Sequence, residues 1–164
     1  MKHTGMKLAL VILVASTIGC DRATKHLAAG KLAGSPVHSY LADTVRLEYA
    51  ENAGGFLSLG ADWPAWVRVS LFAVGTGTML VAIAGAAIRR RWAGRALVGA
   101  CLLLTGGVSN LLDRAASGFV VDFINVGVGP VRTGIFNVAD VAVLLGVSLL
   151  VTARRATEER ATPS

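Results

Sequence analysis

The segment Phe136-Asn-Val-Ala-Asp140-Val-Ala-Val-Leu-Leu145 decides the fold class, because it carries a carboxylate inside an apolar run long enough to continue as a membrane helix. A second acid has a similar setting in Phe119-Val-Val-Asp122-Phe-Ile124. A charged carboxylate at the bilayer centre costs about 2.5–3.5 kcal/mol on insertion scales, so acids in membrane segments usually serve a function. Two of them close in sequence favour a pair that shares one proton.

The composition is that of a membrane protein. The 164 residues are 54% hydrophobic and 16% charged, with a mean hydropathy of +0.61. Charge is too sparse for an ordinary soluble domain, and the length suits a single domain, 1–164. The net charge of +6 does not indicate nucleic acid, because the positive residues gather beside the apolar runs, as in Arg89-Arg-Arg91 and Arg154-Arg155. We therefore expect membrane lipids as partners and no nucleic acid.

The apolar runs predict an α-helical integral membrane protein with four transmembrane helices and a small extracytoplasmic β-sheet. Positive residues in the loop after the second run place that loop, the N-terminus and the C-terminus in the cytoplasm. The two remaining loops then lie outside. The expected helices are roughly 6–27, 66–88, 95–113 and 135–153, the outer loops are 28–64 and 114–134, and a flexible tail is expected at 156–164.

The outer loops contain the signals for the sheet and its turns. Val45-Arg-Leu-Glu-Tyr49 alternates apolar and polar residues, which predicts a short strand. Gly54, Gly55 and Gly60 are expected to form turns, and the glycines around Pro130 predict an irregular second loop.

The topology places Asp122 and Asp140 near the outer boundary of the membrane. Two carboxylates in contact do not both ionise easily, so one keeps a proton near neutral pH. The ionised carboxylate can then deprotonate water, while the protonated one polarises a scissile carbonyl, as in aspartic proteases. The alternative is that Asp140 caps a helix and Asp122 pairs with Arg114 or Arg132.

The remaining polar residues of the apolar segments have plain structural explanations beside functional ones. Asn110 and Arg114 are one helical turn apart, so both can face a peptide backbone or a lipid headgroup, although Arg114 can also reach the interface as an isolated cation. Asp21 and Lys25 are spaced as an i, i+4 ion pair. Asp113 is expected to pair with a neighbouring cation.

No metal or organic cofactor is expected, because His3, His26 and His38 lack ligand spacing. A small non-catalytic transporter or proton-relay protein also carries membrane acids and is the main alternative. Against it, the sequence has no internal repeats, and its acids lie near one edge of the membrane. A membrane assembly factor that performs no chemistry is a third hypothesis, but it does not explain why two aspartates occur in apolar segments.

Five short motifs occur along the chain in a fixed order, and their combination resembles the bacterial lipoprotein signal peptidase (signal peptidase II) family. The match extends from about Leu8 to Leu150. Each motif alone is weak, but five in order with four apolar runs are specific. The motifs are Asp21-x-x-Thr-Lys25, Asn52-x-Gly54, Asn110-x-x-Asp-Arg114, Val120-Val-Asp-Phe123 and Phe136-Asn-x-Ala-Asp140.

The resemblance implies four transmembrane helices with an extracytoplasmic β-cradle in the bacterial inner membrane. It also implies an aspartic endopeptidase that removes the signal peptide from prolipoproteins with a diacylglyceryl-modified cysteine, cutting just before that cysteine. Globomycin-type inhibitors are expected to bind, and a monomer is expected because one chain holds every motif. By motif, the catalytic residues are Asp122 and Asp140, the substrate-binding residues are Asn52, Asn110, Arg114 and Asn137, and the supporting residues are Asp21, Lys25 and Gly54.

Three positions depart from the usual pattern of that family. Ser109 replaces a glycine, Val141 replaces a serine and Gly55 replaces a frequent alanine. All three are small changes beside the key positions, so they concern only the detail of the pocket.

Overall fold

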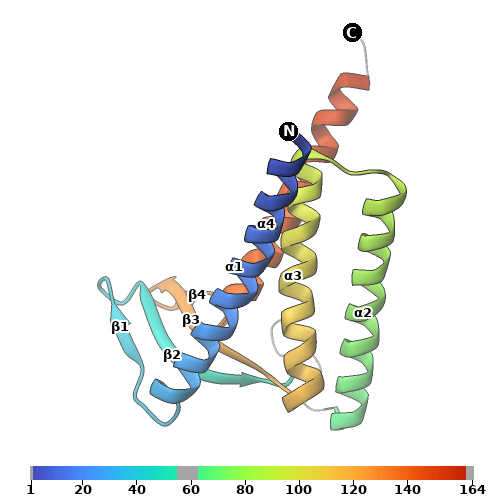
Figure 1. Ribbon diagram of the computed structural model, residues 1–164. Helices are drawn as coiled ribbons and strands as arrows, with labels where there is room; N and C mark the ends of the chain where they lie inside the picture. Colours follow the sequence, from blue (N-terminus) through green and yellow to red (C-terminus); the bar gives the residue numbers. More distant parts are fainter. Residues whose placement is uncertain (1, 55–62, 162–164) are drawn as a thin grey trace.

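The computed structural model describes residues 2–54 and 63–161 and contains, within them, four helices and a four-stranded sheet (Figure 1). The expected turns at Gly55 and Gly60 lie outside the described residues. The helices are α1 (Lys2–Lys31), α2 (Ala65–Arg89), α3 (Gly94–Ser117) and α4 (Val138–Ala161), and the strands are β1 (His38–Tyr40), β2 (Val45–Asn52), β3 (Val120–Val128) and β4 (Val131–Arg132).

Helix α3 is the centre of the helical layer and packs against α4, α2 and α1 (Figure 1). Its contact with α4 is close because glycines stand where the backbones meet. A Cβ added to Gly106 would lie 2.4 Å from the carbonyl oxygen of Ala139, and one added to Gly146 would lie 2.6 Å from the backbone nitrogen of Leu103. Small residues at helix contacts therefore place the start of α4 directly on α3.

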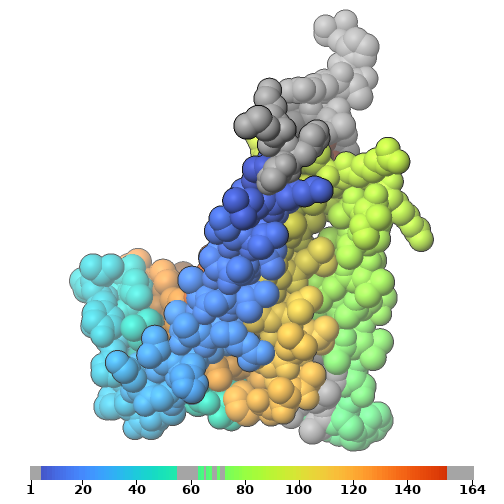
Figure 2. Space-filling model, in the orientation of Figure 1, coloured from blue at the N-terminus to red at the C-terminus, as the bar shows by residue number. Residues whose placement is uncertain are grey.

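The sheet stands beside the helices at the end of the molecule opposite the two termini (Figures 1 and 2). Its strand order is β1-β2-β3-β4, with every neighbouring pair antiparallel. The predicted strand at Val45–Tyr49 is confirmed, and it continues to Asn52 as β2. The register of β2 on β3 shifts between Leu47 and Ala50, and such a bulge re-aims the side chains that follow it.

The second outer loop is more regular than the sequence suggested. Helix α3 continues to Ser117 and ends at Gly118, which has a φ of 82° and donates its N–H to the carbonyl of Arg114. Such a left-handed residue after a helix suits glycine because it has no Cβ. A nine-residue strand, β3, follows at once. Gly129 and Pro130 thus form only the turn between β3 and β4, while Gly127 and the β-branched residues before it belong to the strand.

The helix boundaries agree with the expected ones at α2 and differ at the ends of others. Helix α1 begins earlier and ends later than 6–27. Helix α4 continues through Ala161, into the range expected to be a flexible tail, because its last turns are rich in Ala, Arg and Glu, which are good helix formers.

Within the described residues, one helix, α3, has the length and hydropathy of a membrane span, and a shorter apolar stretch runs over Ala73–Arg89.

Candidate active site

The first turn of α4 is closed by a capping box that contains Asp140. The Oδ1 atom of Asn137, the residue before the helix, accepts a hydrogen bond from the backbone N–H of Asp140 at 3.0 Å. In return, Asp140 Oδ2 accepts one from the backbone N–H of Asn137, also at 3.0 Å. These bonds satisfy N–H groups that a helix start leaves unpaired, and the carboxylate lies at the positive end of the helix dipole. Asn137 is therefore the N-cap residue, and Asp140 takes part in the cap as the third residue of α4, which agrees with one half of the alternative expectation.

Asp122 lies on the other side of the same asparagine. Its Oδ1 accepts a hydrogen bond from Asn137 Nδ2 at 2.6 Å, and its Oδ2 accepts one from Asn52 Nδ2 at 2.9 Å. The register pairs Ala50 with Asp122, so Asn52, two residues further along β2, faces the same side of the sheet. Asn137 thus joins the two aspartates, which we call the dyad.

The Asp122 side chain is almost fully removed from solvent, with the residue 2% exposed. Burial raises the pKa of Asp122, and the nearby Asp140 charge adds to this rise, while the hydrogen bonds from Asn52 and Asn137 oppose it. The Asp122 carboxyl therefore holds its proton to a higher pH than an exposed aspartate does.

Two buried groups of α1, Asp21 and Lys25, bond to the parts of α3 and α4 that lie next to the dyad. The predicted i, i+4 ion pair is confirmed, with Lys25 Nζ 2.7 Å from Asp21 Oδ2. Lys25 also donates to Asn110 Oδ1 at 2.8 Å, and Asn110 Nδ2 donates to Asp140 Oδ1 at 2.8 Å. A continuous chain of hydrogen bonds therefore connects α1 with the dyad.

Asp21 is fully buried and helps to hold the start of α4. Its Oδ1 accepts a hydrogen bond from the backbone N–H of Ala139 at 2.9 Å, and its Oδ2 accepts one from Ser109 Oγ at 2.6 Å. A carboxylate from α1 thus satisfies an unpaired N–H of α4. Asp113 forms the expected ion pairs, with Lys25 at 2.7 Å and with Arg22 at 3.0 Å.

Arg114 holds the end of β2 next to the dyad. Its Nη2 and Nε donate to the carbonyl oxygen of Gly54 at 2.9 and 3.2 Å. The Gly54 N–H donates to Asn52 Oδ1 at 3.1 Å, which leaves the Asn52 amide nitrogen directed at Asp122. Among the described residues, the ion pair of Arg132 is with Asp43, so the alternative pairing of Asp122 with an arginine is not found.

The structure brings all nine residues singled out in the sequence into one connected cluster. Their positions come from α1, the end of β2, α3, β3 and α4. Ser109 is a buried neighbour of this cluster that the sequence analysis noted only as a departure from a pattern. Its place four residues before Asp113, on the face of α3 that meets α1, was the available signal.

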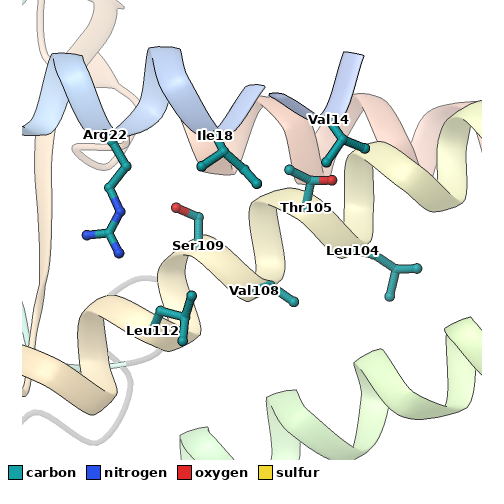
Figure 3. A pocket seen from close by; sticks show the side chains of 8 residues that line it. All are labelled: Val14, Ile18, Arg22, Leu104, Thr105, Val108, Ser109 and Leu112. Atoms are coloured by element: carbon teal, nitrogen blue, oxygen red, sulfur yellow. The ribbon is translucent and has the colours of Figure 1, made fainter. Parts of the chain in front are cut away.

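A shallow apolar groove of about 270 Å³ lies between α1 and α3, with Arg22 and Ser109 toward one end (Figure 3). It is separate from the dyad, which lies where α3 meets α4. Its lining residues are Val14, Ile18, Arg22, Leu104, Thr105, Val108, Ser109 and Leu112.

Solved structures share the fold of this chain. Two solved chains, each described as a bacterial membrane enzyme structure obtained by the in meso method, superpose on this chain. The one at 2.3 Å resolution has a TM-score of 0.81 and 21% identity, and covers 95% of this chain and 93% of its own. The one at 1.9 Å has a TM-score of 0.77 and 23% identity, and covers 88% and 91%. At these identities the likeness shows the fold.

Sequence relatives identify the family. The family model described as signal peptidase (SPase) II matches residues 13–154. A lipoprotein signal peptidase of Sphingopyxis alaskensis is 35% identical over 143 residues, covering 86% of this chain and 82% of the relative. One of Hydrogenovibrio crunogenus is 34% identical over 146 residues, covering 88% and 80%. The chain belongs to the signal peptidase II family of membrane proteases, as its motifs indicated.

Proposed function

We propose that this protein is an aspartic endopeptidase that cleaves the signal peptide from diacylglyceryl-modified prolipoproteins, just before the lipidated cysteine. The observation that carries the proposal is that one asparagine joins the buried Asp122 and the half-buried Asp140, with Asn137 Nδ2 donating to Asp122 and the Asn137 backbone N–H donating to Asp140. Membership of the family supports the substrate class.

The chemistry follows from the shared surroundings of the two carboxyl groups. The raised pKa of Asp122 favours a dyad that holds one proton near neutral pH. The ionised carboxylate takes a proton from water as the water oxygen attacks the scissile carbonyl carbon. The protonated carboxyl donates to the carbonyl oxygen, and a proton then passes to the departing amine as the C–N bond breaks. The titration steps belong to the pair rather than to either residue.

The polar residues around the dyad fit an extended peptide. Asn52 and Arg114 line its approach from the sheet, and Arg114 keeps the Gly54 carbonyl in place. Asn110 and Asn137 add amide groups at the dyad itself. We assign these four residues to substrate binding and Asp21, Lys25 and Gly54 to support of the site.

We place all four helices across the bacterial inner membrane, with both termini in the cytoplasm and the dyad near the outer face. Large apolar side chains on the helix surfaces support this, since Val11 of α1, Val81 of α2 and Leu144 of α4 are 64%, 73% and 67% exposed. The Asp140 carboxylate lies at the first turn of α4 rather than mid-helix, which argues against a transporter. One chain supplies the whole cluster, which fits a monomer.

A lipidated substrate explains the depth of this site. The scissile bond of a signal helix with a lipid tail lies at the outer membrane boundary. A dyad at that depth reaches the bond without drawing lipid into water.

The test is cleavage of a lipidated prolipoprotein by the purified protein in detergent. We expect Asp122→Asn and Asp140→Asn each to abolish cleavage while the protein stays folded, and globomycin to inhibit the wild type. Asp43→Asn, which alters a half-buried aspartate in the turn between β1 and β2, outside the dyad cluster, is the matched control and keeps full turnover. Near-wild-type turnover in either dyad variant removes that residue from the mechanism.

A separate experiment tests the orientation in the membrane. A reporter fused after Arg91 is expected to read cytoplasmic, and one fused after Pro130 is expected to read external. The reverse pattern places the dyad on the wrong side of the membrane for this substrate.

A further inference from the structure

Lys25 is a buried cation whose donors are all directed at oxygen atoms. Its Nζ lies 2.7 Å from Asp21 Oδ2, 2.7 Å from Asp113 Oδ2 and 2.8 Å from Asn110 Oδ1. An ammonium group has three N–H donors and no acceptor. The two carboxylates already exceed its single positive charge, so the third bond, to a neutral amide, is the one that charge balance does not explain.

That third bond determines which way the Asn110 amide faces. An ammonium accepts nothing, so the end of the amide that meets Lys25 must be the oxygen. The Asn110 nitrogen then necessarily points the other way, where it donates to Asp140 Oδ1 at 2.8 Å. Asn137 Nδ2, at 3.3 Å from Asn110 Oδ1, favours the same orientation. A flipped amide would set its oxygen against the Asp140 carboxylate and its NH₂ against the ammonium.

From this geometry we propose that Lys25 is a positioning residue for Asp140 that acts through the Asn110 amide. Lys25 holds the amide so that an N–H faces Asp140 Oδ1, while the Asn137 backbone N–H holds Asp140 Oδ2. Two donors on one carboxylate fix its direction and favour its ionised form relative to a site without them. The inference rests on the proposed peptidase function, and it assigns Lys25 no contact with substrate.

The competing explanation is that Lys25 only neutralises Asp21 and Asp113. The two explanations differ in what a charge-balanced replacement does. Lys25→Gln removes the donor-only group and lets the Asn110 amide turn over, because a Gln amide offers both an acceptor and donors. In Lys25→Gln/Asp113→Asn, one positive and one negative charge leave together, so the net charge is unchanged while the donor-only constraint that Lys25 places on Asn110 is lost.

The experiment measures kcat, KM and thermal stability for cleavage of a lipidated prolipoprotein in detergent. We expect kcat to fall roughly ten- to hundredfold in Lys25→Gln and in the charge-balanced double variant, which corresponds to one lost hydrogen bond to a charged group. KM should change less than about twofold, because Lys25 does not contact the substrate and acts only through Asn110. Arg22→Gln is the matched control: it removes another cation from Asp113 without touching Asn110, and should keep the wild-type kcat.

A double-mutant cycle with Asn110→Ala tests the route. If Lys25 acts through Asn110, Lys25→Gln lowers kcat by less than about twofold once Asn110 is alanine. If Lys25→Gln and Asn110→Ala lower kcat independently, so that their effects multiply in the double variant, the inference is wrong. A wild-type kcat in Lys25→Gln/Asp113→Asn also overturns it. If neither Lys25 variant folds while Arg22→Gln does, Lys25 is purely structural and the inference is wrong. A wild-type protein that does not cleave at all refutes the proposed function instead.

Discussion

Asn137 combines two roles that a pair of substitutions separates. Its Oδ1 caps α4 by accepting the Asp140 N–H, and its Nδ2 donates to Asp122 at 2.6 Å. Asn137→Ala removes both bonds. Asn137→Ser keeps a capping oxygen but loses the donor to Asp122, because serine is shorter and is itself a good N-cap.

The structure supplies an expected magnitude for each role. Loss of an N-cap costs about 1 kcal/mol, which lowers Tm by roughly 2–4 °C in a chain of this size. Loss of the donor leaves an oxygen of the buried Asp122 carboxyl unpaired and costs about 1–3 kcal/mol, which lowers kcat roughly five- to hundredfold if it is felt in the transition state. We therefore expect a similar fall of kcat in both variants and a larger fall of Tm in Asn137→Ala than in Asn137→Ser.

Turnover of a lipidated prolipoprotein and thermal unfolding in the same detergent provide the two readouts. A wild-type kcat in Asn137→Ser would refute the role of the Nδ2 donor. An equal loss of Tm in both variants would refute the capping argument, because only one of them lacks the oxygen.

Three further outcomes are expected. Gly106→Ala should lower Tm, and should lower kcat at least about tenfold, because the added Cβ would lie 2.4 Å from the Ala139 carbonyl oxygen and displace the start of α4. Gly77→Ala is the control, since its Cβ would meet its nearest atom at 4.0 Å. Equal Tm and kcat in the two variants would refute the close approach of α3 and α4. Burial raises the pKa of Asp122, so the stability that its protonated form contributes is full below the ordinary pKa of 3.8 and is lost as pH rises through the higher pKa of the folded state. Asparagine does not titrate, so the Tm of Asp122→Asn minus the Tm of the wild type should increase between pH 4 and pH 8. A difference in Tm that does not change with pH would contradict the raised pKa. Chelators should leave turnover unchanged, whereas inhibition that added zinc reverses would indicate a metalloenzyme.

Local sequence was sufficient for the helices because their signals are local. An apolar run long enough to form α2 or α3 is visible in the residues themselves, and so is the spacing that pairs Asp21 with Lys25 on one helix face. The order of the motifs also indicated the family correctly.

The strand that carries Asp122 was harder to predict. β3 was obscured by the glycines near Pro130, and its identity as a strand depends on pairing with β2, which lies about 70 residues away in the chain and bonds through Asn52 to Asp122. Strand pairing at such a separation leaves no local pattern, because the partner supplies the hydrogen bonds.

Sequence alone determined which residues are candidates for the chemistry: two aspartates in apolar segments, with asparagines and basic residues at helical spacing around them. Only the tertiary structure decided how these groups are oriented. The amide of Asn137 is directed by the Asp140 N–H, and that of Asn110 by Lys25. The physical reason is that an amide has a donor end and an acceptor end, and which end faces a carboxylate depends on the third group that occupies the other.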